Sequence, residues 1–265
     1  MARSRFETAD WHGAVGALLA ADGGKEMAAR LIEAFGQVVQ HDGTCLLAFH
    51  PDAPPEVLHH TLEPAGARHY VDRYLAGPYL LDPLYELALR THKPPLCRFR
   101  DATPDRFHSS EYYHQYCERT HLKDEMDFLY EIGNGSTLVL VIGRRARKFS
   151  QAELARLELI APMVRASMKR VWEKWHQDSE REVPDKSIHQ RLIECFRNFG
   201  DGVLTERERE ITQLLLRGHS SKSVARELDI APGTVMVHKR NLFAKLGITS
   251  QFELFSRFIS ALSGD

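Results

Sequence analysis

Four short amphipathic segments follow one another near the C-terminal end of the printed sequence, and they constrain the fold more than any other feature. The first begins at Thr205, whose hydroxyl can cap a helix while Glu208 reaches back from the third helical position. Its apolar residues recur at helical spacing, and Gly218 ends it. Helices this short need partners to bury their apolar faces. The pattern therefore predicts an all-α, four-helix domain over residues 203–265.

The other three segments carry their own start and stop signals. The second is predicted over Ser221–Leu228 and is followed by a short turn. Pro232 begins the third, where its missing N–H costs nothing, and Gly247 ends it. The fourth opens with a second capping box formed by Ser250 and Glu253. Two helices joined by a tight turn are thus predicted in the middle of the domain.

The third helix is predicted to have two different faces. The face toward the core carries Val235, His238, Leu242 and Leu246. The outward face carries Met236, Val237, Arg240 and Ala244. A helix presented this way fits the major groove of double-stranded DNA. Arg240 can bond guanine or a phosphate, and Met236 and Val237 can contact thymine methyl groups.

Charge is distributed in a way that suits a local nucleic-acid contact. The net charge is −1, so the chain is not a basic protein that coats nucleic acid. Residues 230–252, however, contain no acidic side chain. Lys222, Lys239 and Lys245 are expected to contact phosphates. For Arg240 and Lys239 the alternative is that they lie on a solvated helix face. The predicted DNA contacts are Lys222, Thr234, Met236, Val237, Lys239, Arg240 and Lys245.

The segment LTEREREI…RGHSSKSVAREL…APGTVMVHKRNLFAKLGI resembles the LuxR-type helix-turn-helix, which also occurs in response regulators of the NarL kind. The resemblance implies a DNA-binding transcription regulator and not an enzyme. It also implies that Met236, Val237 and Arg240 occupy base- and phosphate-contacting positions. Ala231 departs from the family pattern, in which Ser or Thr usually caps the recognition helix. The missing cap is expected to cost about 1 kcal/mol of stability.

The preceding sequence predicts a separate domain and a linker. A polar, Pro-containing stretch and the glycines of FGDG lie between Gln177 and Val203. They enclose a predicted helix over Ser187–Phe199, with apolar residues at three- and four-residue spacing. We expect a sensing domain over residues 1–178, a linker over 179–202, and the DNA-binding domain over 203–265.

The first domain is expected to have an α+β fold. Asn134-Gly135 between two apolar runs is a strong hairpin signal. Ser150 and Glu153 form a capping box that opens a long helix. Strands are predicted over 44–50, 57–62, 126–132 and 137–142, and helices over 26–40, 66–76, 83–91, 111–120 and 151–175. Helices flanking an antiparallel sheet favour a sensor of the GAF or PAS kind.

Residues 68–88 interleave aromatic side chains with one carboxylate, as small-molecule pockets often do. They resemble the W-x-x-x-Y…D-P signature of acyl-homoserine-lactone-binding domains, in which the Asp accepts a hydrogen bond from the ligand amide. Tyr70 and Tyr74 would take the aromatic places and Asp82-Pro83 the D-P. Alternatively, Asp82 only caps a helix and the tyrosines are core residues. The ligand-binding candidates are Tyr70, Tyr74, Asp82, Tyr85, Phe99 and Tyr113.

Several other classes of protein and site are disfavoured. No apolar run approaches the roughly 18 residues of a membrane span, and no secretory signal is evident. The four cysteines form no C-x-x-C pair, and the histidines do not cluster at metal-ligand spacing. Nucleophile-elbow, phosphate-loop and phosphoacceptor patterns are also missing. We expect a cytoplasmic protein that is not an enzyme and has no metal or other cofactor.

The sequence thus predicts a regulator that binds DNA as a homodimer, because one such helix reads only a short half-site. A small-molecule effector is expected to control it through the first domain. The alternative is a first domain that binds a protein partner and no metabolite.

Overall fold

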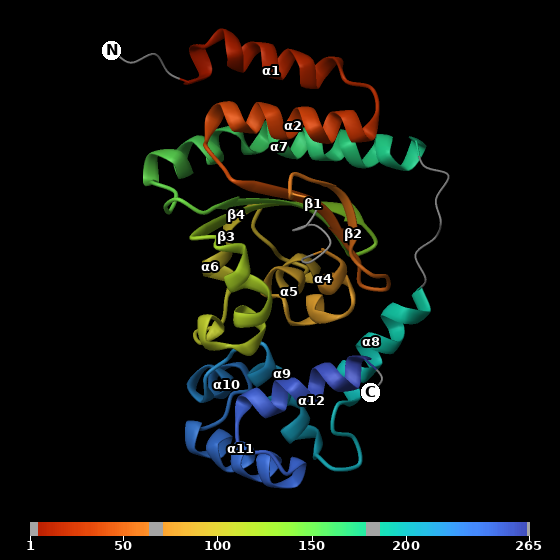
Figure 1. Ribbon diagram of the computed structural model, residues 1–265, viewed down its shortest axis with the longest axis vertical. Coiled ribbons are helices and arrows are strands. Elements are labelled where there is room, and N and C mark those ends of the chain that lie inside the picture. Colours follow the sequence, from red (N-terminus) through yellow and green to blue (C-terminus); the bar gives the residue numbers. More distant parts are fainter. Residues whose placement is uncertain (1–4, 64–70, 179–185, 264–265) are drawn as a thin grey trace. The chain divides into compact units, whose positions relative to one another are not determined.

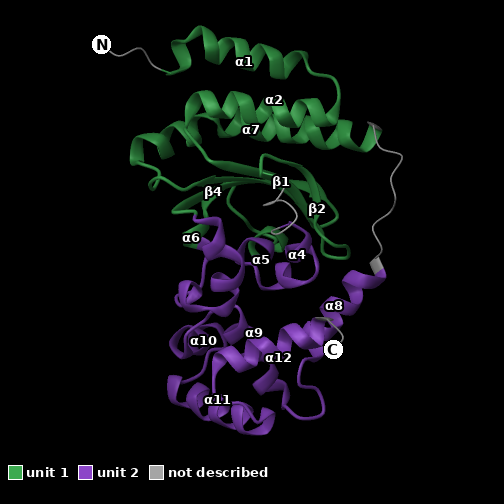
Figure 2. Ribbon diagram, viewed as in Figure 1, with its two compact units in different colours: residues 1–67, 87–101, 122–184 green, residues 68–86, 102–121, 185–265 purple. Residues whose placement is uncertain are grey.

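The computed structural model describes residues 5–63, 71–178 and 186–263. The chain forms two compact units, coloured separately in Figure 2. Unit 1 contains residues 1–67, 87–101 and 122–184, and unit 2 contains residues 68–86, 102–121 and 185–265. Two segments from the middle of the chain therefore pack with its C-terminal part, and the division falls within a short helix, α5 (Pro83–Leu89).

Unit 1 contains a five-stranded sheet with the order β2-β1-β5-β4-β3, and every neighbouring pair is antiparallel. This confirms the predicted sheet. Asn134 and Gly135 turn the central hairpin with φ values of 52° and 71°, the left-handed pair that its turn requires. The strands are β1 (Gly43–Phe49), β2 (Glu56–His60), β3 (Leu96–Arg98), β4 (Asp124–Gly133) and β5 (Ser136–Arg144).

Three long helices cover one face of this sheet in two layers (Figure 1). Helices α2 (Gly24–Val38) and α7 (Gln151–Asp178) lie side by side on the sheet, and α1 (Ala9–Ala20) packs outside α2. A Cβ at Gly24 would lie 2.7 Å from the backbone nitrogen of Trp175, so glycine allows α2 to start against α7. The α+β class predicted for this region is confirmed.

The core of unit 1 lies between these helices and the sheet. Side chains on alternate strand positions meet apolar side chains of α2 and α7. Phe35 of α2 meets Phe128 of β4 edge to face, with ring centroids 5.8 Å apart. The largest fully buried side chains of this core include Met27, Leu31, Phe35, Leu46, Phe128, Leu138 and Leu140.

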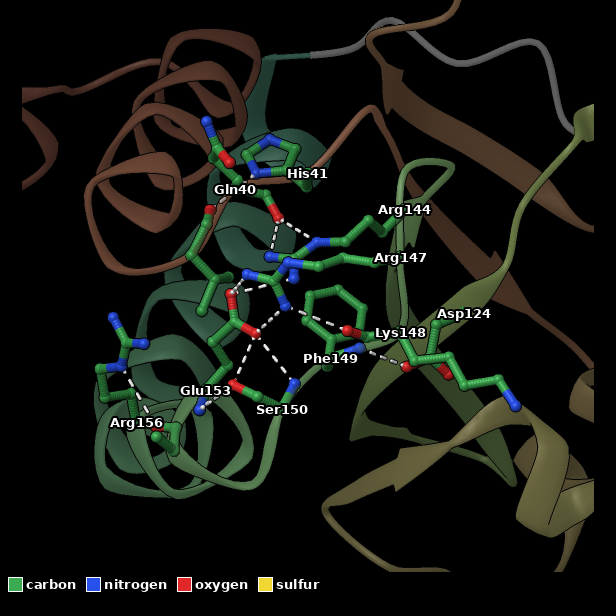
Figure 3. A network of polar contacts seen from close by, with 12 residues as sticks. Gln40, His41, Asp124, Arg144, Arg147, Lys148, Phe149, Ser150, Glu153 and Arg156 are labelled. Carbon is green, nitrogen blue, oxygen red and sulfur yellow. Dashed lines mark hydrogen bonds and ion pairs between the residues drawn. The ribbon is translucent and has the colours of Figure 1, made fainter.

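A polar network fastens the end of β5, the central strand of the sheet, to the start of α7 (Figure 3). Arg144, which is 2% exposed, donates to Glu153 Oε1 at 2.9 Å and to the carbonyl oxygen of Gln40 at 2.8 Å. Arg147 donates to the other Glu153 oxygen at 2.7 Å. Ser150 and Glu153 also form the predicted capping box. Since the buried charges are paired with one another, this cluster is part of the scaffold.

Between the strands the chain forms short helical turns. The predicted helix over 66–76 falls partly outside the described residues; its described part contains α4 (Arg73–Leu75). The predicted helix over 111–120 is helical throughout, but from Tyr113 it changes to π-type turns over Tyr113–Cys117 and 3-10 turns over Glu118–Thr120. The remaining short elements are Arg5–Glu7, Pro78–Leu81, α6 (Phe99–Ala102) and Phe107–Ser109.

Unit 2 contains the five C-terminal helices (Figure 2): α8 (Lys186–Asn198), α9 (Glu206–Leu216), α10 (Ser221–Glu227), α11 (Pro232–Leu246) and α12 (Gln251–Ser263). The four-helix domain predicted from the sequence is therefore present. Thr205 and Glu208 form the predicted capping box, and Gly247 ends α11 with φ 60°. Within the described ranges, no helix is long and apolar enough to cross a membrane.

Candidate functional site

Helix α11 presents two large apolar side chains to solvent. Met236 is 64% exposed and Val237 is 46% exposed, although both lie in the middle of a well-formed helix. Arg240 is exposed on the same face, while Val235 and Leu242 on the opposite face are fully buried. An exposed apolar pair beside an arginine, on a helix whose other side is anchored, is suited to contact a partner surface.

The position of α11 is fixed by the turn before it and by the helices beneath it. Asp229 adopts φ 51° in the turn between α10 and α11, where a short polar residue tolerates the left-handed region. The Arg207 guanidinium donates to the carbonyl oxygen of Leu228 at 2.8 Å, which ties this turn to α9. The start of α11 is therefore positioned by contacts with α9.

The three predicted phosphate-contacting lysines differ in their surroundings. Lys222 on α10 is exposed. Lys239 is partly buried with its ammonium 5.4 Å from the Phe243 ring centroid; burial and then the charge of Arg106 lower its pKa. Lys245 donates to Glu208 at 2.7 Å. Lys245 thus already contributes to the packing of α11 on α9.

Tyr74 and Asp82, two of the predicted ligand contacts, are hydrogen-bonded to each other. The Tyr74 hydroxyl donates to Asp82 Oδ2 at 2.7 Å, and the backbone N–H of Leu84 donates to Asp82 Oδ1 at 2.8 Å. Burial raises the pKa of Asp82 to about 6, against these two hydrogen bonds, which lower it. Asp82 therefore caps α5 and also holds a tyrosine, so that both of its oxygens accept hydrogen bonds.

A buried contact that the sequence did not predict joins this region to α8. The Tyr79 hydroxyl and His189 Nδ1 are 2.6 Å apart, and their rings stack at 10°. Tyr85 meets the Tyr79 ring edge to face at 5.2 Å. His189, Leu192 and Phe196 form the buried side of α8, whereas Ile188 is 47% exposed. The three- and four-residue spacing of these side chains predicts a helix with one buried face, but it does not identify Tyr79 as the residue that this face contacts.

The remaining predicted ligand contacts are not brought together. Tyr70 lies outside the described residues. Phe99 begins α6 and is assigned to unit 1, whereas Tyr74, Asp82 and Tyr85 belong to unit 2. Tyr113 belongs to a different aromatic group, 4.7 Å from His108 and 5.6 Å from Phe107 by ring centroids. The candidate ligand residues therefore reduce to the cluster around Tyr74 and Asp82.

The remaining His, Cys, Asp and Glu side chains were candidates for a metal site. Among the described residues, no three His, Cys, Asp or Glu side chains are grouped as metal ligands would be. The four cysteines form no disulfide, and their side chains are partly buried. Burial raises the pKa of Cys45 to about 12, which keeps that thiol protonated and poorly nucleophilic at neutral pH.

Comparisons with known proteins cover most of the chain. Residues 202–258 match the family described as bacterial regulatory proteins, luxR family. A putative HTH-type transcriptional regulator in the exeN 3' region of Aeromonas salmonicida is 31% identical over 157 residues, which cover 57% of this chain and 80% of that protein. The monoamine regulon transcriptional regulator of Klebsiella aerogenes is 25% identical over 244 residues, or 91% of this chain and 94% of that protein.

Among solved structures, the VqsR LBD domain from Pseudomonas aeruginosa is similar to this chain. It is 28% identical with a TM-score of 0.57, and the match covers 63% of this chain and 99% of that domain.

Proposed function

Since the chain belongs to the luxR family of bacterial regulatory proteins and is a transcriptional regulator of that type, we propose that the exposed face of α11 enters the major groove of DNA. One observation carries the proposal: Met236 and Val237 stay exposed beside Arg240 on a helix whose opposite face is buried. In helix-turn-helix proteins the second helix of the motif reads base edges in this way.

Within this proposal the side chains have separate roles. Met236 and Val237 contact thymine methyl groups, and Arg240 bonds guanine or a phosphate. Thr234, Lys222 and Lys239 contact the DNA backbone. Such contacts fix the position of the protein on the DNA but do not distinguish one base sequence from another. Lys245 joins them only if it shares its ammonium with Glu208, to which it donates at 2.7 Å.

Replacing Arg240 tests the DNA-binding role. A duplex is first selected from a random pool with the wild-type chain, and its affinity is then measured by a shift assay at fixed salt. Arg240→Ala is expected to lose about 1–3 kcal/mol of binding free energy. Arg257→Ala removes the same charge from an exposed position on α12 and serves as the matched control. Equal losses in the two variants would show that α11 has no special role.

We further propose that a small molecule bound in the N-terminal region controls DNA binding. The functional division is then a sensing region over residues 1–178, a linker over 179–202 and a DNA-binding domain over 203–265. The likeness to the VqsR LBD domain supports this, as does the partly buried Tyr74–Asp82 pair at the predicted ligand position. An amide or hydroxyl donor on the effector would share the Asp82 carboxylate with Tyr74.

A protein partner is the second candidate for the controlling signal. It is favoured by the fact that both Asp82 oxygens and the Tyr79 hydroxyl already have partners within the chain. A thermal-shift screen of metabolites separates the two possibilities, because a ligand present at 100 times its Kd adds about 2.7 kcal/mol of stability. A hit that is lost in Asp82→Ala supports the small-molecule effector. If no compound of a broad library stabilises the chain, the result favours a protein partner as the controlling signal.

A further inference from the structure

A short segment that precedes β4 in the sequence packs on the turn between α9 and α10. The backbone N–H of Arg106 donates to the carbonyl oxygen of Gly218 at 3.1 Å. Gly218 has φ 93°, and a Cβ there would lie 3.0 Å from Phe107 Cα. Phe107 itself is 1% exposed. Because only glycine permits this approach, the backbone of the segment and the backbone of the turn fit closely together.

Asp105 completes this contact with two hydrogen bonds to one residue. The backbone N–H of Ser220 donates to Asp105 Oδ1 at 2.9 Å, and the Ser220 hydroxyl donates to Oδ2 at 2.5 Å. These hydrogen bonds outweigh burial, so the pKa of Asp105 is lowered and its carboxylate is charged at neutral pH. We call Asp105, its two bonds to Ser220 and the Arg106–Gly218 bond the clasp.

The clasp lies beside helices that the DNA-binding proposal uses. Ser220 is the N-cap of α10, and its hydroxyl also accepts from the Ser223 backbone. Lys222, a proposed phosphate contact, follows two residues later. Arg106 lies near enough to α11 for its charge to lower the pKa of Lys239, after the larger effect of burial. The segment therefore contacts the start of α10, the first helix of the helix-turn-helix motif.

We propose that the clasp is an autoinhibitory contact, which holds the helix-turn-helix domain on the 104–107 segment and opposes its binding to DNA. This inference rests on the proposed function. In such motifs the first helix crosses the DNA backbone, so a carboxylate fixed at the start of α10 repels the phosphates that approach Lys222. Asp105 is exposed, so its hydrogen bonds contribute little stability and open readily. A contact of this strength suits a reversible device.

Releasing the clasp tests the proposal directly. Asp105→Ala is expected to tighten binding to the duplex selected with the wild-type chain, by roughly three- to tenfold in Kd. Glu227→Gln removes one negative charge from an exposed position on α10 without touching the clasp, and is the control for charge alone. An equal gain in both variants, or no gain in Asp105→Ala, would overturn the proposal.

A second measurement reports the clasp without DNA. The Ser220 amide is expected to exchange hydrogen faster in Asp105→Ala than in the wild-type chain, and at an unchanged rate in Glu227→Gln. An unchanged rate in Asp105→Ala would mean that the clasp does not form. Faster exchange without tighter DNA binding would mean that it forms but does not inhibit, and this result also overturns the proposal.

A covalent lock tests the opposite direction. The double variant Asp105→Cys, Ser220→Cys is compared with itself in oxidised and reduced form, with the new disulfide verified by peptide mass. The oxidised form is expected to bind the selected duplex more weakly than the reduced form; equal binding counts against inhibition. If Arg240→Ala weakens binding while no clasp variant changes it, the proposed function stands and this inference fails. If neither Arg240→Ala nor any clasp variant changes DNA binding, the proposed function and this inference both fail.

Discussion

Two pairs of oppositely charged side chains are buried in unit 1. Arg98 donates to Asp124 through two nitrogens, with Nε to Oδ1 at 2.7 Å, and the pair is 8% and 7% exposed. Arg144 and Glu153 are buried to a similar degree. Removing one partner of such a pair leaves an uncompensated buried charge, which costs far more than an exposed ion pair contributes.

Glu153→Gln is therefore expected to destabilise the protein strongly. It keeps the shape of the side chain but leaves the Arg144 charge without its carboxylate, so the free energy of unfolding should fall by roughly 3–5 kcal/mol. Glu158→Gln on the exposed side of α7 is the matched control, and should change stability by less than about 0.5 kcal/mol. Denaturant unfolding measures both; similar losses in the two variants would contradict a structural role for the network.

The same residue gives stability a pH dependence with a defined sign. Hydrogen bonds from Arg147, Ser150 and Arg144 outweigh burial and hold the pKa of Glu153 below its ordinary value of 4.5. A depressed folded-state pKa contributes stability above pH 4.5, and this contribution is lost as the pH falls further. The difference in stability between the wild-type chain and Glu153→Gln should therefore shrink as the solution is acidified.

At the scale of single elements, α11 begins without a side-chain cap. Ala231 has the extended backbone of an N-cap, with φ −70° and ψ 141°, but no side chain that can accept a hydrogen bond from the first turn. Because Ala231 is exposed, a hydroxyl can be added there without disturbing the packing. The helix proposed to read DNA is thus less stable at its start than it could be.

Ala231→Ser is expected to raise the free energy of unfolding by about 1 kcal/mol. The control, Ala244→Ser, makes the same change at an exposed position inside α11, where serine lowers helix propensity by roughly 0.5 kcal/mol. Thermal unfolding should therefore move in opposite directions in the two variants. A shift of the same sign in both would show that the start of α11 is already satisfied in solution.

The elements with strong local signals were predictable from the sequence. Capping boxes at Thr205 and Ser150 and the Asn134-Gly135 turn each specify backbone geometry within a few residues. Helix α1 was not predicted, because its Ala- and Gly-rich sequence has little helical periodicity. Strand β3 was also not predicted, since its three residues are too few to show alternation.

The candidate site was only partly predictable, for a different physical reason. The two faces of α11 follow from its own periodicity, so Val235 and Leu242 are buried and Met236 and Val237 exposed as expected. The contact between Tyr79 and His189 joins residues 110 positions apart. No local pattern specifies such a pairing, which depends on how the whole chain packs.

At the scale of the whole molecule, residues 71–86 and 102–121 belong to the same compact unit as the C-terminal helices, although the strands of unit 1 flank them in the sequence. Tyr79 meets α8 and Asp105 meets the start of α10. The proposed effector region and the proposed clasp thus belong to the same unit as α11. Ring contacts from Tyr74 to Tyr79 and from Tyr79 to His189 join the Tyr74–Asp82 pair to α8.

The length of DNA that one α11 helix can contact bears on how many copies of the chain bind together. One α11 helix spans only a short half-site, so we propose that two copies of the chain bind together, on half-sites related by two-fold symmetry. The selected duplex should then contain two inverted copies of a short sequence, about one helical turn or a multiple of it apart.

The most direct measurement compares the DNA sequences that the wild-type chain and Arg240→Ala select from the same random duplex pool. If the exposed face of α11 reads base edges, the variant loses its preference at one position in each half-site and keeps the others. If both chains select the same sequence with the same preference at every position, α11 is not the element that reads the bases.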